Sequence, residues 1–248
     1  MISSCLTTSL IWAGVIPVSG SGSSVWSHSQ ETLSGLWLPS YTGSPWVGSA
    51  SAGTSGGKNL AAASNAATVG TAVNGFTPAS CGTNRRLFTS DTGYLTSSTG
   101  ALTVLCKASA ASADNATPGN SANPMVFGEG AGDLWIAFST VGFRIGCYNG
   151  SNYSGDIVIA ANTGEWHLVQ ARWGGGTFQA RRNGGSWSSV SRTPLLTWTG
   201  LQMGTSFSPQ RWFAGDILFA TSSLVTLSDA TADKELEWAR GQFQLELT

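Results

Sequence analysis

The chain has 248 residues, of which 12 are basic and 13 are acidic, and its formal charge at neutral pH is −1. Charged side chains make up 10% of the residues, against roughly 25% in an ordinary soluble domain. The basic residues are scattered from Lys58 to Arg240, so the sequence lacks the clustered Lys and Arg that a phosphate-binding surface requires. Nucleic acid is therefore excluded as an expected partner.

The apolar content and the cysteines limit the possible fold classes. Hydrophobic residues make up 41% of the chain, with 11 Trp and 10 Phe, which argues against wholesale disorder. A β-sandwich or barrel of about 200–250 residues can form one domain. No C-x-x-C spacing joins the four cysteines, so buried thiols are expected in place of a zinc site or a dithiol pair. These cysteines are Cys5, Cys81, Cys106 and Cys147.

The first thirty residues are interpreted as an arm, residues 1–30, before a domain at 31–248. Their apolar residues follow no sustained period of 2 or 3.6. The first basic residue is Lys58, so the positive flank of a secretory signal is missing. The longest apolar run of this segment, residues 10–16, is also shorter than the roughly 20 residues of a membrane span. The arm residues expected to contact a partner are Leu10, Ile11, Trp12, Val15 and Ile16.

Beyond the arm, short apolar runs separated by Gly, Asn, Asp and Pro predict an all-β domain. The predicted strands, in chain order, are residues 35–39, 101–106, 133–138, 143–148, 165–173, 177–182 and 212–220. Gly, Ser and Ala dominate up to about residue 67, and a second polar stretch covers 108–124, so both segments are predicted to be loops.

The clearest local prediction is a three-stranded meander around the Asn183-Gly184 pair. Asn-Gly is a strong hairpin signal, because both central residues of a type I′ turn need positive φ. Alternation along residues 165–173 places apolar side chains on both faces, which is typical of a central strand in a sandwich. One face is expected to carry His167, Val169, Ala171 and Trp173, and the other Trp166 and Leu168.

A single helix is predicted over residues 229–240, close to the end of the sequence. Ser228 or Asp229 would be its N-cap, and Gly241 would end it. The side chains expected to dock the helix on the body are Leu236, Trp238 and Phe243.

Over residues 33–245, four motifs in order resemble those of laminin-G-like, concanavalin-A-type jelly-roll domains. They lie at residues 165–172, 182–185, 213–217 and 227–230. Variants that end in Leu-Ser-Asp and a helix are similar to domains of bacteriophage structural proteins. The resemblance implies an all-β, concanavalin-A-like β-sandwich (jelly roll) with an extended N-terminal arm and one short C-terminal helix.

Catalytic patterns are missing from the sequence. Glycosidases of this fold use Glu-x-Asp-x-x-Glu, and no Glu-x-Asp occurs here. Glu235 and Glu237 fall on the predicted helix, where their spacing points them apart. The G-x-S-x-G match at 53–57 lacks the strand and helix of a nucleophile elbow. His167 is predicted to be a packed, hydrogen-bonded strand residue and not a catalytic base, so no enzyme activity is expected.

Metal and cofactor sites are not expected either. The resemblance implies calcium at a loop rim, where Asp133 or Asp156 would take part, but isolated carboxylates favour solvated turn and strand-end roles. In addition, Leu218-Phe219-Ala220 follows the third motif where the family often has acidic residues.

Aromatic side chains near turns are the remaining candidates for contacts with a glycan or a protein partner, with burial in the core or in a subunit interface as the alternative. They are Trp46, Trp187, Trp198 and Trp212.

The leading functional hypothesis from the sequence is a virion structural protein, made in the host cytoplasm without a signal peptide. It would be a capsid decoration or cement protein that binds the major capsid protein, other virion proteins or its own copies as a homo-oligomer. Sparse charge and an apolar arm favour this hypothesis. The alternative is a lectin-like, carbohydrate-binding module of a phage tail or fibre that contacts surface glycans.

Overall fold

A computed structural model describes residues 33–37, 41–43, 60, 65–83, 85–88, 93–113, 124–129, 133–151, 156–197, 200–205 and 212–248. Within these ranges the strands form two antiparallel sheets, one of eight strands and one of six. The larger sheet contains β1 (Leu33–Trp37), β2 (Thr68–Val69), β3 (Ala79–Cys81), β5 (Gly100–Ala108), β10 (His167–Gly174), β11 (Thr177–Arg182), β12 (Ser188–Ser191) and β14 (Gly215–Ser223). The smaller sheet contains β4 (Leu87–Phe88), β6 (Met125–Glu129), β7 (Leu134–Ser139), β8 (Gly142–Cys147), β9 (Ile157–Ile159) and β13 (Leu201–Met203).

The strand order of the larger sheet is β12-β11-β10-β5-β14-β3-β2, and that of the smaller sheet is β4-β13-β6-β7-β8-β9. Strand β14 is long enough to pair with two strands on its far side. Its first residues pair with β3 and its last residues pair with β1. Neighbours in the sheets are therefore often distant in the sequence, as a jelly roll requires.

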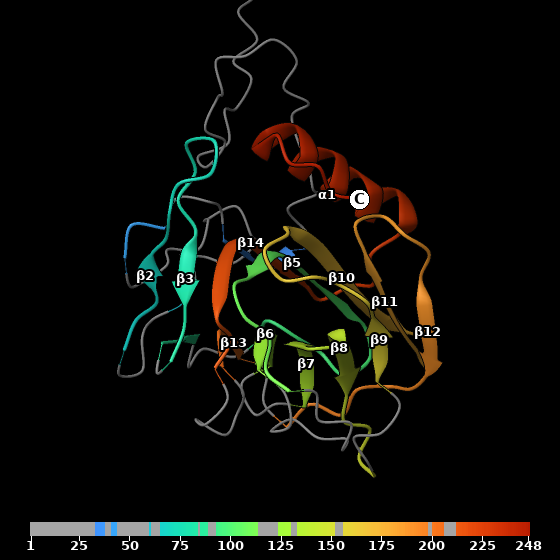
Figure 1. The fold of residues 1–248 in the computed structure, drawn as a ribbon. Helices are drawn as coiled ribbons and strands as arrows, with labels where there is room; N and C mark the ends of the chain where they lie inside the picture. The colour runs from blue at the N-terminus through green and yellow to red at the C-terminus, as the bar shows by residue number, and fades with distance from the viewer. Residues whose placement is uncertain are drawn as a thin grey trace, which may run out of the picture.

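The hydrophobic core lies between the two sheets (Figure 1). Trp37 of β1 packs edge-on against Phe127 of β6, with ring centroids 6.2 Å apart, and so joins one sheet to the other. Trp173 and Phe178 stack across the β10–β11 pair and are also buried. The predicted all-β sandwich is thus confirmed.

Strand β10 is central, as its sequence predicts, because it pairs with β5 on one side and β11 on the other. Val169, Ala171 and Trp173 face the core between the sheets. Leu168 faces the opposite way and joins a second apolar cluster on the outer face of the sheet. Two apolar faces on one strand mean that both sides of the larger sheet are covered here.

The meander β10–β11–β12 is also confirmed. Asn183 and Gly184 have φ of 50° and 79°, the left-handed values that the Asn-Gly turn predicts. The side chain of Asn183 accepts a hydrogen bond from the backbone N–H of Leu168 at 2.7 Å. This bond fixes the turn against the start of β10.

Helix α1 (Asp229–Phe243) lies across the outer face of the larger sheet (Figure 1). Its N-cap is Ser228, whose side chain accepts a hydrogen bond from the N–H of Thr231. The predicted end at Gly241 is wrong, since the helix continues to Phe243 and ends at Gln244, with φ of 51°. Phe243 is fully buried against Phe76 and Trp238, and this packing outweighs the weak helix propensity of one glycine.

The last predicted strand begins later than expected. Residues 212–214 lie outside β14, and Trp212 forms only an isolated bridge with Thr205. In the part of the chain that the structure describes, no helix combines the length and apolarity that crossing a membrane requires.

Candidate functional site

Trp187 lies just after the β11–β12 turn, and two arginines stack on its ring. The guanidinium carbon of Arg172 is 3.9 Å from the ring centroid, and that of Arg181 is 4.6 Å away. The indole also packs against Ala101, Leu227 and Ala232 and remains partly exposed. Cation–π contacts of this kind orient an aromatic ring as well as stabilise it. We call Trp187, Arg172, Arg181, Asp229 and Asp233 the Trp187 cluster.

Helix α1 supplies the acidic half of the Trp187 cluster. Arg172 pairs with Asp229 at 2.6 Å, and Arg181 pairs with Asp233 at 2.8 Å. The two carboxylates are one helical turn apart, so both reach the sheet from the same side of the helix. The hydrogen bond and charge of Arg172 hold the pKa of Asp229 below its ordinary value of 3.8. Asp229 is therefore a carboxylate at neutral pH.

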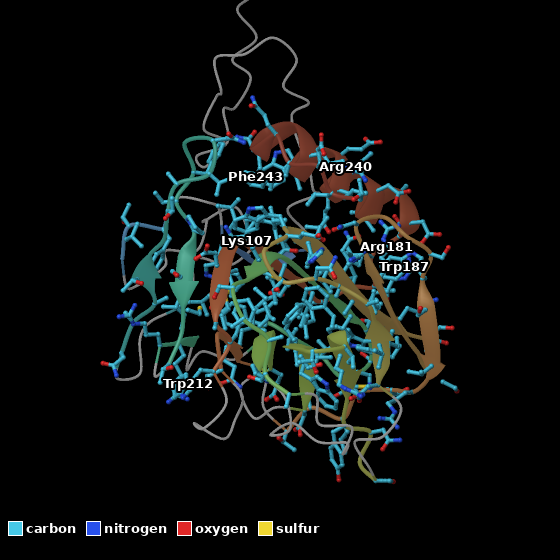
Figure 2. The ribbon with its side chains drawn as sticks, in the orientation of Figure 1. Lys107, Arg181, Trp187, Trp212, Arg240 and Phe243 are labelled. Carbon is cyan, nitrogen blue, oxygen red and sulfur yellow. The ribbon has the colours of Figure 1, made fainter. Side chains whose placement is uncertain are left out.

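Exposure differs sharply within the Trp187 cluster. The side chains of Arg172 and Arg181 are only 12% and 5% exposed, whereas those of Asp229 and Asp233 are 69% and 56% exposed. The cluster thus presents two carboxylates and part of an indole to solvent, whereas its guanidinium groups are almost buried. Arg181 and Trp187 lie side by side in Figure 2.

A buried polar network supports the Trp187 cluster from below. Arg181 donates its Nε–H to Gln170 at 2.8 Å, and Gln170 in turn donates to Glu235 at 2.7 Å. Thr103 donates to the same Glu235 oxygen at 2.7 Å. Because these groups are buried and bonded, the network holds Arg181 in place.

The other tryptophan candidates do not join this cluster. Trp212 is half-buried and lies on the opposite side of the molecule in Figure 2, away from Arg181 and Trp187. Trp46 and Trp198 lie outside the described residues. So do all five arm residues, namely Leu10, Ile11, Trp12, Val15 and Ile16.

A second cation–aromatic contact lies elsewhere on the outer face of the larger sheet. Lys107 of β5 is 5.0 Å from the ring centroid of Trp166 and 3.6 Å from Asp216 of β14 (Figure 2). Trp166 also packs against the apolar cluster beneath helix α1. These contacts cover the sheet face next to the helix.

His167 is packed and hydrogen-bonded, as its sequence context predicts. Its Nε2 is 3.0 Å from the carbonyl oxygen of Asn162, and its ring meets Phe143 edge-on. Burial lowers its pKa from 6.5, so the imidazole is neutral and donates through Nε2. A base committed to a backbone carbonyl in the core is not placed to act on a ligand.

Asp133 and Asp156 do not fit a calcium shell, which needs about six to eight oxygen ligands. A carboxylate oxygen of Asp133 accepts a hydrogen bond from the N–H of Thr197 at 3.0 Å. Asp156 pairs with Arg144 at 3.7 Å. Among the described residues, no group of three or more His, Cys, Asp or Glu side chains is close enough to hold a metal ion.

Sequence reasoning singled out Trp187 but missed the four charged partners that surround it. One signal was present: Arg172 and Arg181 each occupy an outward position in a strand whose other face is in the core. An arginine on that face requires an acidic partner on the element that covers the face. Asp229 and Asp233, spaced by one turn on the predicted helix, meet this requirement.

No protein-family model matches the chain, and no curated protein matches its sequence. Solved structures do match. A Trypanosoma rangeli sialidase in complex with sialic acid has a TM-score of 0.59 and 11% identity over 94% of this chain and 36% of the sialidase. Domain 4 of an extracellular arabinanase from Geobacillus stearothermophilus, in complex with arabinotriose, has a TM-score of 0.54 and 12% identity over 83% of this chain and 98% of the domain.

A third match is the receptor-binding domain of botulinum neurotoxin type G, with a TM-score of 0.57 and 9% identity over 84% of this chain and 51% of that one. This chain spans about a third of each sialidase chain that it resembles. Identities this low concern the fold alone. Together with the two antiparallel sheets and the C-terminal helix, these matches establish a jelly-roll-like, all-β sandwich.

Proposed function

We propose that this protein is a non-catalytic, lectin-like domain that binds a saccharide at the Trp187 cluster. The observation that carries the proposal is the grouping of a partly exposed indole with two exposed carboxylates, all held by buried arginines. Saccharide sites combine an aromatic surface for the C–H face of the sugar with a few fixed polar groups for its hydroxyls. Asp229 and Asp233 would accept hydroxyl hydrogen bonds beside Trp187.

The rigidity of the Trp187 cluster favours binding. A side chain that is already ordered loses little conformational entropy when a ligand arrives. Trp187 is fixed by stacking, and both aspartates are fixed by ion pairs with arginines whose Nε–H groups bond to Gln179 and Gln170 of the sheet. A saccharide would meet a preformed surface.

The solved structures add support of a coarser kind. The arabinanase domain that this chain covers almost completely was solved with arabinotriose, and the neurotoxin domain is a receptor-binding domain. They support a binding role for this type of sandwich.

The charges of the Trp187 cluster support binding without catalysis. A general acid must keep its proton near neutral pH. The pKa of Asp229 is instead lowered by Arg172, and Asp233 is ion-paired with Arg181. The carboxylate of Asp229 is thus held in a form suited to accepting hydrogen bonds.

The capsid-decoration hypothesis remains a prediction from the sequence. Its principal contact residues belong to the arm, which lies outside the described residues. The solved structures favour the saccharide-binding alternative over it. Particle association of the chain with and without residues 1–30 would test the decoration hypothesis directly.

Binding to a glycan array, followed by calorimetry on the best saccharide, tests the proposal. Trp187→Ala should weaken binding at least about tenfold, a loss of roughly 1.4 kcal/mol. Trp187→Phe, which keeps an aromatic ring, should lose less.

Trp238→Phe is the matched control, because Trp238 is buried between helix α1 and the sheet, where its ring packs against Phe219 and Phe243. It should lower the melting temperature while leaving affinity unchanged. The proposal fails if no saccharide binds, or if Trp187→Ala binds as tightly as the wild type.

A further inference from the structure

We propose that the Trp187 cluster selects uncharged saccharides and rejects acidic ones, such as sialylated or uronic acid-containing glycans. This inference rests on the proposed function and adds the class of ligand. It follows from where the positive and negative groups of the cluster lie.

The four charged groups of the Trp187 cluster cancel in pairs. Arg172 faces Asp229 and Arg181 faces Asp233, so two positive charges meet two negative ones. An acidic sugar would therefore find no excess positive charge to attract it. The low overall charge of the chain, −1, adds no long-range attraction either.

Several of the guanidinium donors that could bind a sugar carboxylate are already engaged within the protein. Arginine recognises a carboxylate through two parallel N–H groups. Arg172 gives Nε–H to Gln179 at 2.8 Å, and its Nη1 donates to the carbonyl of Leu227 and to Asp229. Arg181 gives Nε–H to Gln170, and its Nη2 lies 2.8 Å from Asp233. A ligand carboxylate would have to displace a charge-assisted pair.

The groups that an approaching ligand meets first are negative. Asp229 and Asp233 are more than half exposed, whereas both arginines are almost buried. A ligand carboxylate a few Å from an exposed aspartate is repelled by roughly the amount that weakens binding fivefold in water. Neutral hydroxyls meet no such cost and can donate to the same carboxylate oxygens.

The test compares the same saccharide with its carboxylate either free or blocked as the methyl ester. Suitable pairs are the methyl ester of sialyllactose with sialyllactose, and methyl-esterified oligogalacturonate with its free acid. At about 20 mM salt, where screening is weak, each neutral sugar that binds should bind at least about fivefold more tightly than its acidic partner. At about 0.5 M salt, the difference should shrink.

The double variant Asp229→Asn/Asp233→Asn gives a sharper readout. It leaves two unpaired guanidinium groups beside Trp187, so the preference should reverse toward the acidic member of each pair. A merely structural role for the aspartates would lower affinity for both members equally. The melting temperature of this variant controls for loosening of helix α1.

Three results would overturn the inference. Equal or tighter binding of the acidic sugars by the wild type would remove the charge selection while leaving saccharide binding in place. If the folded double variant still preferred neutral to acidic saccharides, Asp229 and Asp233 would not be the source of the selection. Binding of no saccharide of either kind would overturn both this inference and the proposed function.

Discussion

The side-chain amide of Asn183 donates a hydrogen bond to the backbone carbonyl of Thr248 at 2.7 Å. The same side chain accepts a bond from the N–H of Leu168. One turn residue therefore connects the β11–β12 turn, the start of β10 and the segment that follows helix α1. The turn is a tertiary anchor as well as a local reversal of the chain.

Asn183→Ala should lower the free energy of unfolding by about 2–4 kcal/mol, because it removes two hydrogen bonds. It also places alanine at a positive φ, which alanine adopts less readily than asparagine. Asn183→Gly keeps the backbone conformation at no steric cost and loses only the bonds. Urea denaturation of both variants separates the two effects. Equal stability of the alanine variant and the wild type would contradict this account.

Phe243→Ala should destabilise the protein by about 3–5 kcal/mol, the usual cost of removing a buried aromatic ring. Its ring is fully buried, 5.2 Å from that of Phe76 and 5.3 Å from that of Trp238. Thermal unfolding measures the loss. Glu237→Ala, on the exposed side of the same helix, is the control and should stay within about 0.5 kcal/mol of the wild type.

His167 should make the protein less stable as the pH falls below 6.5. Burial lowers its folded-state pKa from 6.5, so the unfolded chain takes up the proton first. The stabilisation is complete above pH 6.5 and is lost as the pH falls from there toward the folded-state pKa. His167→Gln should remove this dependence in denaturation curves collected across that window.

His28 is the other imidazole of the sequence, so His28→Gln is the control for this titration. Protonation of His167 is unfavourable in the folded protein because its buried Nδ1 has no hydrogen-bond partner among the described groups. A proton placed there would be unsatisfied. An unchanged pH profile in His167→Gln would show that another group is responsible.

The thiols of Cys81, Cys106 and Cys147 should resist alkylation at pH 8 in the folded protein. All three are free and buried, and burial raises the pKa of Cys81 and of Cys147 to about 12. Iodoacetamide labelling followed by peptide mass spectrometry should find them unmodified until denaturant is added. Rapid labelling of any of them without denaturant would show that its strand opens locally.

The sequence was most informative where one residue type has only one reasonable structural role. Asn183-Gly184 specified its turn, and the alternation along β10 identified a strand covered on both sides. It was least informative where a distant contact decides the outcome. Gly241 looked like a helix end, but burial of Phe243 carries the helix past it.

The candidate site shows the same division. Trp187 could be selected from its place beside a turn, whereas Trp212, selected for the same reason, lies far from it (Figure 2). The pairing of Arg181 with Asp233 joins β11 to helix α1, and no local pattern states which carboxylate meets which arginine. Long-range register decides that pairing, and it emerges only when the helix is docked.

Glu235 restricts helix α1 to one position on the larger sheet. Its fully buried carboxylate accepts hydrogen bonds from Thr103 and Gln170, next to the apolar cluster of leucine and aromatic side chains under the helix. If the helix slid by one turn, about 5.4 Å, apolar contacts could re-form. The carboxylate, however, would lose both donors while still buried, at a cost of several kcal/mol. A buried carboxylate thus sets the alignment of the helix, and with it the alignment of Asp229 and Asp233 over their arginines.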